Sequence, residues 1–188
     1  MESLLKKSCS LKSLLKEDED VPDFPNMAQV ISQNVQANVY IIGRRGKVLG
    51  CHLWDQNSCS NIQHVLAFSE RFPESYNQKL LSILDTQNIM TDTESSCIFS
   101  PNECPLPERY VAVLPIYGWG ERLGTIALAS AAKKITDEAL ILAEFGAMVV
   151  GMGVMLLKVK RAETEDKNTA NVQIALKAMS FSELKSVI

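Results

Sequence analysis

The segment "GRRGKVLG", residues 43–50, carries the side chains whose types and spacing could do chemistry. Arg44, Arg45 and Lys47 follow one another closely between glycines. Charge-assisted hydrogen bonds from such side chains can hold a phosphate anion. The first two glycines of the segment are closer together than those of a P-loop, and no Ser or Thr follows its lysine. It therefore fits either a basic turn that binds phosphate or a hairpin turn whose charges lie in solvent.

The sequence offers no local set of residues for catalysis or for a metal site. His52 and His64 are its two histidines. Cys51 precedes His52, but neighbours on a strand point to opposite faces, so they cannot form a nucleophile–base pair. The spacing of Cys51, His52, Cys59 and Cys97 matches no standard zinc site. We therefore predict neither enzymatic activity nor a bound metal ion.

Composition and charge indicate one globular domain with appendages. The chain has 188 residues, of which 46% are hydrophobic and 22% charged, and its formal net charge is −3. That balance argues against a nucleic-acid surface, which needs clustered Lys and Arg. The longest continuous apolar run, "GAMVVGMGVMLL", is shorter than a membrane span, and the first residues do not resemble a signal peptide. We expect a cytoplasmic protein with no membrane segment and with reduced thiols.

Hydrophobic periodicity predicts helices and strands in the order α-α-β-β-α-α-β-β-β-α. The expected helices span residues 2–16 and 26–37, two helical segments within 57–84 with a new start at Pro73, and a long helix capped by Thr136; the expected strands span 38–43, 47–53, 95–100, 109–117 and 122–130. Strands in antiparallel pairs between terminal helices indicate an α+β fold, with an antiparallel sheet packed by the N- and C-terminal helices. Small-molecule sensor domains of the GAF or PAS type have this layout.

The last residues, "SFSELKSVI", predict the beginning of a further helix. Ser180 and Glu183 have the spacing of a capping box, which marks a helix N-terminus. The polar stretch before it continues the pattern of the long helix and is expected to form a linker helix.

Five motifs in order give the chain a resemblance to a known family. They are "NVYIIGRRGKVLG", "RFPESY", "VLPIYGWGERLGTIAL", "LILAEFGAMVVGM" and "ALKAMSFSEL". The sequence resembles the CodY family of GTP-sensing pleiotropic transcriptional repressors of Firmicutes, with a weak stretch between Cys51 and Ser69. The resemblance implies a GAF-like effector-sensing and dimerisation domain at residues 1–155, a linker helix at 156–179, and the start of a winged helix-turn-helix domain at 180–188.

The resemblance also implies two ligand sites. The branched-chain amino acid pocket would be lined by Phe72, Pro73, Tyr76, Cys97 and Phe99. The nucleotide site, for GTP, would use Phe24, Arg44, Arg45, Lys47 and Lys158.

The chain departs from the family pattern at two places. The family carries an Arg for the ligand carboxylate about ten residues before its Phe-Pro pair, whereas residues 57–68 contain no Arg or Lys. The family carries a Glu suited to guanine where this chain has Gly153.

Taken together, the sequence predicts the effector-sensing part of a DNA-binding global transcriptional repressor. Its effectors would be branched-chain amino acids, GTP or both, and it would have no catalytic residues and no cofactor. We expect a homodimer that contacts DNA only through a C-terminal winged-helix domain outside this chain. The alternatives are a degenerate GAF scaffold that serves dimerisation alone, and a sensor of a different small ligand.

Overall fold

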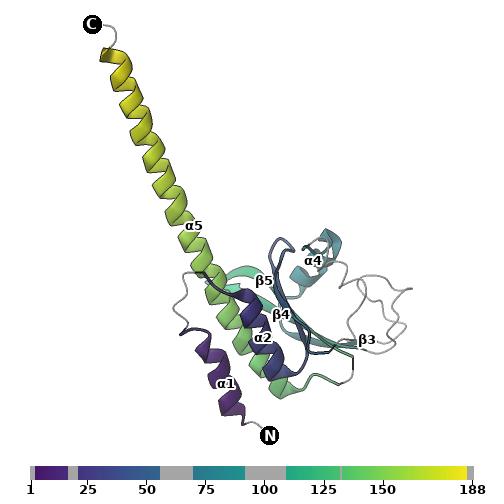
Figure 1. Cartoon of the computed structure of the whole chain (residues 1–188). Coiled ribbons are helices and arrows are strands. Elements are labelled where there is room, and N and C mark those ends of the chain that lie inside the picture. The colour runs from purple at the N-terminus through teal and green to yellow at the C-terminus, as the bar shows by residue number, and fades with distance from the viewer. Residues whose placement is uncertain (1–2, 17–20, 56–69, 92–108, 132, 186–188) are drawn as a thin grey trace.

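A five-stranded antiparallel sheet with helices on both faces forms the domain (Figure 1). The computed structural model describes residues 3–16, 21–55, 70–91, 109–131 and 133–185. The elements are α1 (Leu4–Ser13), α2 (Phe24–Val35), β1 (Asn38–Gly43), β2 (Val48–His52), α4 (Glu74–Ser82), β3 (Gln87–Thr91), β4 (Arg109–Gly118), β5 (Glu121–Ser130) and α5 (Asp137–Lys185).

The strands lie in the order β2-β1-β5-β4-β3. Strands β4 and β5 form the longest ladder, from the pair Tyr110 and Ser130 to the pair Gly118 and Glu121. Their connection has positive φ at both central residues, 49° at Trp119 and 79° at Gly120, as a type I′ hairpin turn requires. The central position of β1 and β5 brings the β1–β2 turn next to the beginning of β5.

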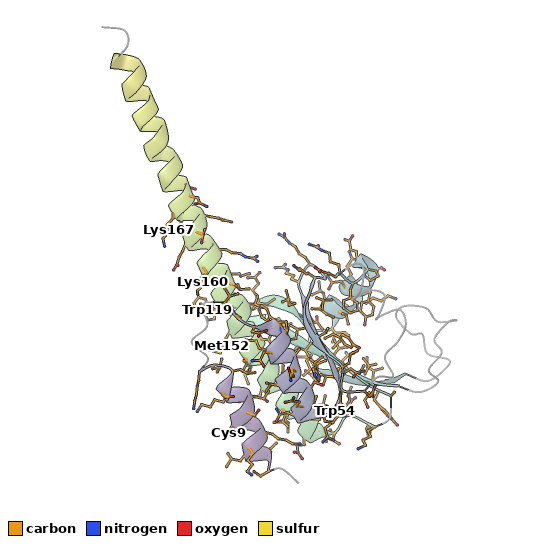
Figure 2. All side chains as sticks on the ribbon, in the orientation of Figure 1. Cys9, Trp54, Trp119, Met152, Lys160 and Lys167 are labelled. Carbon is orange, nitrogen blue, oxygen red and sulfur yellow. The ribbon has the colours of Figure 1, made fainter. Side chains whose placement is uncertain are left out.

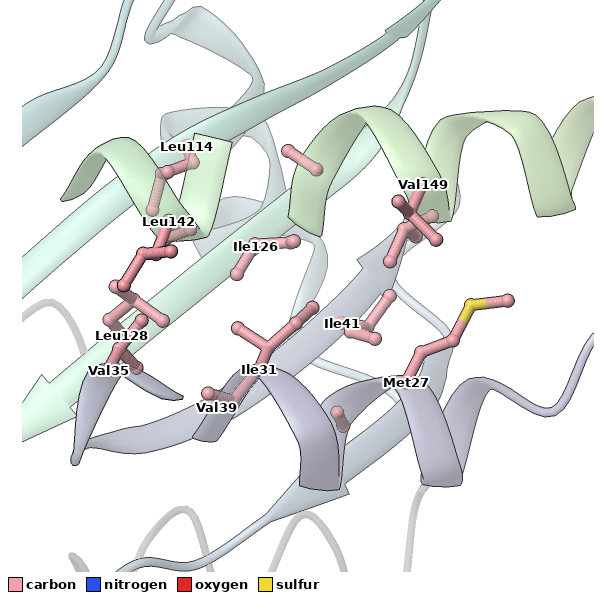
Figure 3. Packing of buried hydrophobic residues seen from close by; sticks show 14 of the residues in the cluster. Met27, Ile31, Val35, Val39, Ile41, Leu114, Ile126, Leu128, Leu142 and Val149 are labelled. Carbon is pink, nitrogen blue, oxygen red and sulfur yellow. The ribbon is translucent and has the colours of Figure 1, made fainter. Parts of the chain in front are cut away.

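The back face of the sheet, covered by α1, α2 and α5, holds the main core (Figures 1 and 3). Alternate residues of each strand point toward these helices, as the two-residue period of a strand dictates. The largest fully buried side chains of this core are Leu11, Ile31, Val39, Ile41, Leu114, Ile116, Ile126, Leu128 and Leu142.

The front face of the sheet carries α4 and a smaller core. The intervening strand residues point this way. They are Tyr40 and Ile42 of β1, Val113 of β4 and Ala127 of β5, and they pack with Phe72, Tyr76 and Leu80.

Local capping fixes where the covering helices begin and end. Asp23 caps α2 by accepting a hydrogen bond from the backbone N–H of Asn26 at 3.0 Å, and Gln36 ends the helix in a left-handed conformation. Thr136 caps α5 by accepting from the N–H of Ala139, as predicted from the sequence. Asp137 and Glu138 then lie in the first turn of α5, where the helix dipole favours acids.

Helix α5 is 49 residues long and extends well beyond the sheet (Figure 1). Residues Asp137–Thr169 contain an 18-residue window of mean hydropathy 2.2, which by length and composition alone could cross a membrane. The same stretch contributes Leu142, Ala147 and Val150 to the back-face core. The core helix of a soluble protein passes the same test, and 44% of this window is buried inside the domain, so the window is weak evidence for a membrane span.

The predicted α+β architecture and the β1–β2 hairpin are confirmed. Strand β3 was not predicted, because "QNIMT" is a short edge strand with little alternation. The strand expected at 95–100 and the helix expected at 57–69 lie outside the described residues. Helix α5 continues through Ser180 without interruption, so the capping-box spacing there does not mark a helix start. The division into sensor, linker and further domain stays a prediction.

Candidate functional site

The basic turn between β1 and β2, residues 44–47, is a tightly bonded loop. The N–H of Gly43 donates to the carbonyl of Lys47, and the N–H of Gly46 donates to that of Gly43, both at 2.8 Å. Gly46 has φ of 79°, a conformation that other residues adopt only with strain. Glycine thus allows the chain to reverse within a few residues and leaves Arg44, Arg45 and Lys47 exposed on the turn.

The segment that leads into α4 holds the basic turn from the other side. The N–H of Phe72 donates to the carbonyl of Gly46, and the N–H of Val48 donates to that of Glu70, each at 2.9 Å. The side-chain amide of Asn77, buried on α4, donates to the carbonyl of Arg44 at 3.0 Å. The turn is therefore bonded to the same segment that carries the predicted amino-acid wall.

A cavity of about 550 Å³ opens between the β1–β2 hairpin, the beginning of α2 and α5. Phe24 and Lys47 both line it, as the predicted nucleotide site requires, and Arg161 and Glu70 add two further charged side chains. Its other lining residues are Val21, Pro22, Pro25, Val48, Leu49, Gly50, Cys51 and Leu157. The volume is in the range of small-molecule sites. Apolar walls with two cations at the rim suit a flat base joined to a phosphate chain.

Glycine at position 50 allows α2 to approach this hairpin. A Cβ on Gly50 would lie 2.3 Å from the carbonyl oxygen of Phe24, which no side chain can occupy. The backbone of Phe24 thus rests directly on β2, and the wall of the cavity is closed on that side.

Two of the predicted nucleotide residues converge on one carboxylate instead of lining the cavity. Arg44 donates from Nη1 to Oε1 of Glu121 at 2.9 Å, and Lys158 donates from Nζ to Oε2 at 2.5 Å. The hydrogen bond from Lys158, together with the charges of both cations, holds the pKa of Glu121 below its ordinary value. The structure therefore brings together Phe24 with Lys47, and Arg44 with Lys158, while Arg45 lies exposed on the turn.

Gly153 lies behind Phe24, on the far side from the hairpin. A Cβ there would lie 3.2 Å from Cβ of Pro22 and 3.4 Å from the ring of Phe24. An apolar cavity of about 310 Å³ adjoins it, lined by Leu14, Leu15, Pro22, Asp23, Met27, Val149, Met152, Gly153 and Leu156. Position 153 therefore adjoins Pro22 and Phe24, two residues that also line the larger cavity.

One wall of the predicted amino-acid pocket lies in the described part of the chain. Phe72 and Tyr76 are buried on the front face and stack on each other with ring centroids 5.1 Å apart. Pro73 precedes the first residue of α4 and is exposed. Cys97 and Phe99, the predicted opposite wall, lie outside the described residues, so the structure neither places them nor separates them from the wall seen here.

Among the described residues, Arg122 lies at the end of α4, and N–H groups on all three of its guanidinium nitrogens already donate to protein acceptors. Its guanidinium donates to the carbonyls of Leu80, Ile83 and Gly124 and to the hydroxyl of Thr125, at 2.6 to 3.2 Å. These bonds satisfy the carbonyls that the end of a helix leaves without partners. Arg122 therefore fixes α4 to β5 and does not replace the carboxylate-binding Arg of the family pattern.

Sequence reasoning missed two residues that the geometry makes important, Glu121 and Arg161. Glu121 lies within the "VLPIYGWGERLGTIAL" motif, where no local pattern connects it with the basic turn. Figure 2 shows Trp119 on this hairpin beside α5, where Met155 packs against Gly118. Arg161 lies one helical turn after Leu157, so its place could have been found only from the register of α5 against the hairpin.

A family model described as the CodY GAF-like domain matches residues 3–178 of the chain. The global transcriptional regulator CodY of Clostridium botulinum strain Okra is 36% identical over 189 aligned positions, which cover all of this chain and 73% of the relative. CodY of Clostridium kluyveri is likewise 36% identical with the same coverage.

Solved structures show the same fold. The cofactor-binding GAF domain of the nutrient sensor CodY from Clostridium difficile is 30% identical, with a TM-score of 0.59 over 82% of this chain and 99% of that one. Free methionine-R-sulfoxide reductase from Neisseria meningitidis has a TM-score of 0.55 over 84% and 91%, at 12% identity. The second likeness concerns the fold alone.

Proposed function

Because the chain belongs to the CodY family of global transcriptional regulators, we propose that its effector-binding GAF domain binds GTP between the basic turn, α2 and α5. The observation that carries the proposal is the cavity of about 550 Å³, where Phe24, Lys47 and Arg161 meet. The base would lie against the apolar wall, and the phosphates would extend toward the turn. Arg44 and Lys158 would then add charge-assisted hydrogen bonds to phosphate oxygens.

The proposal includes weak selection of guanine over adenine. Specific hydrogen bonds to a base need a polar group at the right place, and glycine at position 153 supplies none. The phosphates would dominate the affinity, so ATP would bind nearly as well as GTP. Gly153→Glu would add a carboxylate beside Phe24 and is expected to increase the preference for GTP.

The front face is proposed to bind a branched-chain amino acid against the stacked rings of Phe72 and Tyr76. The apolar side chains around them, which include Tyr40, Ile42 and Val113, suit the aliphatic side chain of such a ligand. Arg122, at the end of α4, is bonded to protein carbonyls and is therefore not available for the ligand carboxylate. This observation favours the second candidate function, a domain that responds to nucleotide and keeps its front face as a scaffold.

A stripe of exposed apolar side chains along α5 supports the proposal of a homodimer. The stripe consists of Ile141, Phe145, Met148, Met152, Leu156 and Val159, between 38% and 62% exposed. Their spacing of three and four residues is that of a helix–helix seam. Leu15 of α1 lines the same small cavity as Met152 and Leu156 and so extends the stripe. A second copy of the chain would cover this surface, which is too apolar and continuous to suit a monomer.

In the whole regulator, effector binding would shift the population of a cytoplasmic dimer toward the DNA-binding form. DNA contact would be made outside the GAF domain.

Sedimentation of the wild type and of Met148→Glu tests the proposed homodimer. The variant is expected to weaken self-association at least about tenfold, because two charges would be buried in an apolar seam. Gln29→Glu, which adds the same charge on an exposed position of α2, is the control, and equal dimerisation of both variants would contradict the stripe as interface.

A thermal-shift titration with GTP, ATP, isoleucine and valine tests the effectors. A ligand that binds only the folded state adds about 2.7 kcal/mol of stability at a hundredfold excess over its dissociation constant. We expect a shift with both nucleotides. A shift with isoleucine would show that its carboxylate has a partner elsewhere in the chain. No shift with any of the four would contradict the sensor function and leave the dimerisation scaffold.

A further inference from the structure

Three elements meet at the carboxylate of Glu121. Glu121 is the first residue of β5, Arg44 belongs to the β1–β2 turn, and Lys158 belongs to α5. Each cation donates to a different oxygen, Oε1 for Arg44 and Oε2 for Lys158. The backbone strengthens the arrangement, since the N–H of Arg44 also donates to the carbonyl of Leu123 at 2.9 Å. One carboxylate thus occupies two cations that the proposed nucleotide site would use.

From this geometry we propose that Glu121 is a built-in competitor of the effector phosphates, which must displace it from Arg44 and Lys158. The inference rests on the proposed nucleotide site and adds a regulatory residue to it. A carboxylate with two donors is a close chemical stand-in for a phosphate with two donors, because both present anionic oxygens to the same side chains. In the ligand-free domain the site is therefore electrostatically satisfied by the protein itself.

The strength of the contact suits a competitor that can be displaced. All three side chains are partly in solvent, with 61% exposure for Arg44, 43% for Glu121 and 46% for Lys158. Ion pairs between exposed side chains are weak, because water and salt screen the charges. A triphosphate carries several charges and would also reach Lys47 and Arg161 on the cavity rim. It therefore outcompetes one carboxylate, but at a reduced net affinity.

The position of Lys158 connects this exchange to the helix that leaves the domain. From Arg161 to Thr169 the side chains of α5 are exposed, and Lys158 lies just before this stretch (Figure 2 labels Lys167 within it). In the ligand-free state Glu121 joins α5 to the β4–β5 hairpin. When phosphate replaces Glu121, the ion pair between α5 and the hairpin is lost, Met155 still packs at Gly118, and α5 becomes joined to the β1–β2 turn through the ligand. The exchange changes which part of the sheet holds the emerging helix.

Isothermal titration of the wild type and of Glu121→Gln with Mg·GTP, and separately with inorganic tripolyphosphate, tests the proposal. Gln keeps the size of the side chain and removes its charge. We expect roughly two- to thirtyfold tighter binding of both ligands, the fold-change that corresponds to two exposed ion pairs. Asp85→Asn is the matched control, because it removes an equal charge from the exposed loop after α4. The control separates a local effect at the turn from the general field of the protein.

A second variant tests whether the gain in ligand affinity comes from the cations that Glu121 contacts. In a Lys158→Met background, Glu121→Gln is expected to tighten binding less than it does in the wild type, because one of the two cations is gone. Equal affinity of the wild type, Glu121→Gln and Asp85→Asn would overturn the competitor role while leaving the nucleotide site intact. Weaker binding by Glu121→Gln would also overturn it, since Glu121 would then position the cations. Failure of all three proteins to bind either ligand would overturn the nucleotide site as well.

Discussion

The two faces of the sheet differ in how completely side chains fill them. On the back face, three helices and the inward residues of the strands interlock around fully buried branched side chains (Figure 3). On the front face, the described residues that cover the sheet are α4 and the stacked rings of Phe72 and Tyr76, and they bury a smaller apolar cluster. Among the described residues the back face thus holds the larger buried core. The front face is bonded to the basic turn through Phe72, whereas α2 and α5 line the cavity beside it together with Lys47.

The largest predicted difference between the faces is the cost of a cavity. Ile31 is fully buried, and the space around it is so tight that a Cβ on Gly146 would lie 2.8 Å from its Cδ1. Ile31→Ala should lower the free energy of unfolding by about 3–5 kcal/mol. Leu80→Ala on the front face should cost about 2–3 kcal/mol, because its surroundings can collapse more easily. Urea unfolding of both variants checks the order, and equal or reversed costs would contradict the distinction between the faces.

The attachment of α4 gives the next largest effect. Arg122→Met removes the side-chain donor to the carbonyl of Ile83 and one of the two donors to the carbonyl of Leu80, which keeps the N–H of Ile83. The free energy of unfolding should fall by about 1–3 kcal/mol, and amide exchange should accelerate in α4 before it does in α2. Arg122→Lys is the control, because it keeps the charge but cannot reach all four acceptors. Unchanged exchange in α4 of the methionine variant would show that packing alone holds this helix.

The link between the basic turn and the front face is tested by a pair of glycines. Gly46 and Gly120 both have φ of 79°. A Cβ on Gly46 would lie 3.2 Å from the carbonyl of Phe72, whereas nothing lies within 4 Å of a Cβ on Gly120.

Alanine at either glycine adds left-handed strain of about 1–2 kcal/mol. Gly46→Ala should therefore lower the free energy of unfolding more than Gly120→Ala does, and the difference should reflect only the contact with the carbonyl of Phe72. Thermal unfolding of both variants measures this difference. Equal costs would mean that the turn and the α4 segment do not constrain each other.

The smallest expected effect is on the acid side of the stability curve. The folded-state pKa of Glu121 is lowered from the ordinary value of 4.5, chiefly by the hydrogen bond from Lys158. Its contribution to stability is therefore complete above the unfolded-state pKa and is lost as the pH falls through the folded-state pKa. Glu121→Gln should flatten the decline of the unfolding midpoint below about pH 4.5 slightly. An identical acid decline in both proteins would show that the pairs contribute nothing in solution.

The sequence predicted what depends on neighbouring residues and missed what depends on register between elements. Arg44, Arg45 and Lys47 are close in sequence, so any tight turn presents them together, and the apolar runs of β1, β4 and β5 predicted these strands. Phe24 and Lys158 came from the resemblance, because no local pattern connects them with the turn. Glu121 and Arg161 were missed, since their roles follow from how β5 and α5 lie against the hairpin. Strand β3 was missed because an edge strand needs little apolar alternation.

Hydrogen-exchange mass spectrometry with and without GTP tests the central claim, that the effector nucleotide binds where the basic turn meets α2 and α5. The account predicts slower exchange in peptides that cover residues 43–50, 21–28 and 153–161. It also predicts faster exchange at the β4–β5 hairpin around Glu121, which the phosphates would release. Protection confined to the front face, around Phe72 and Tyr76, would contradict the account, and so would exchange that GTP leaves unchanged throughout the domain.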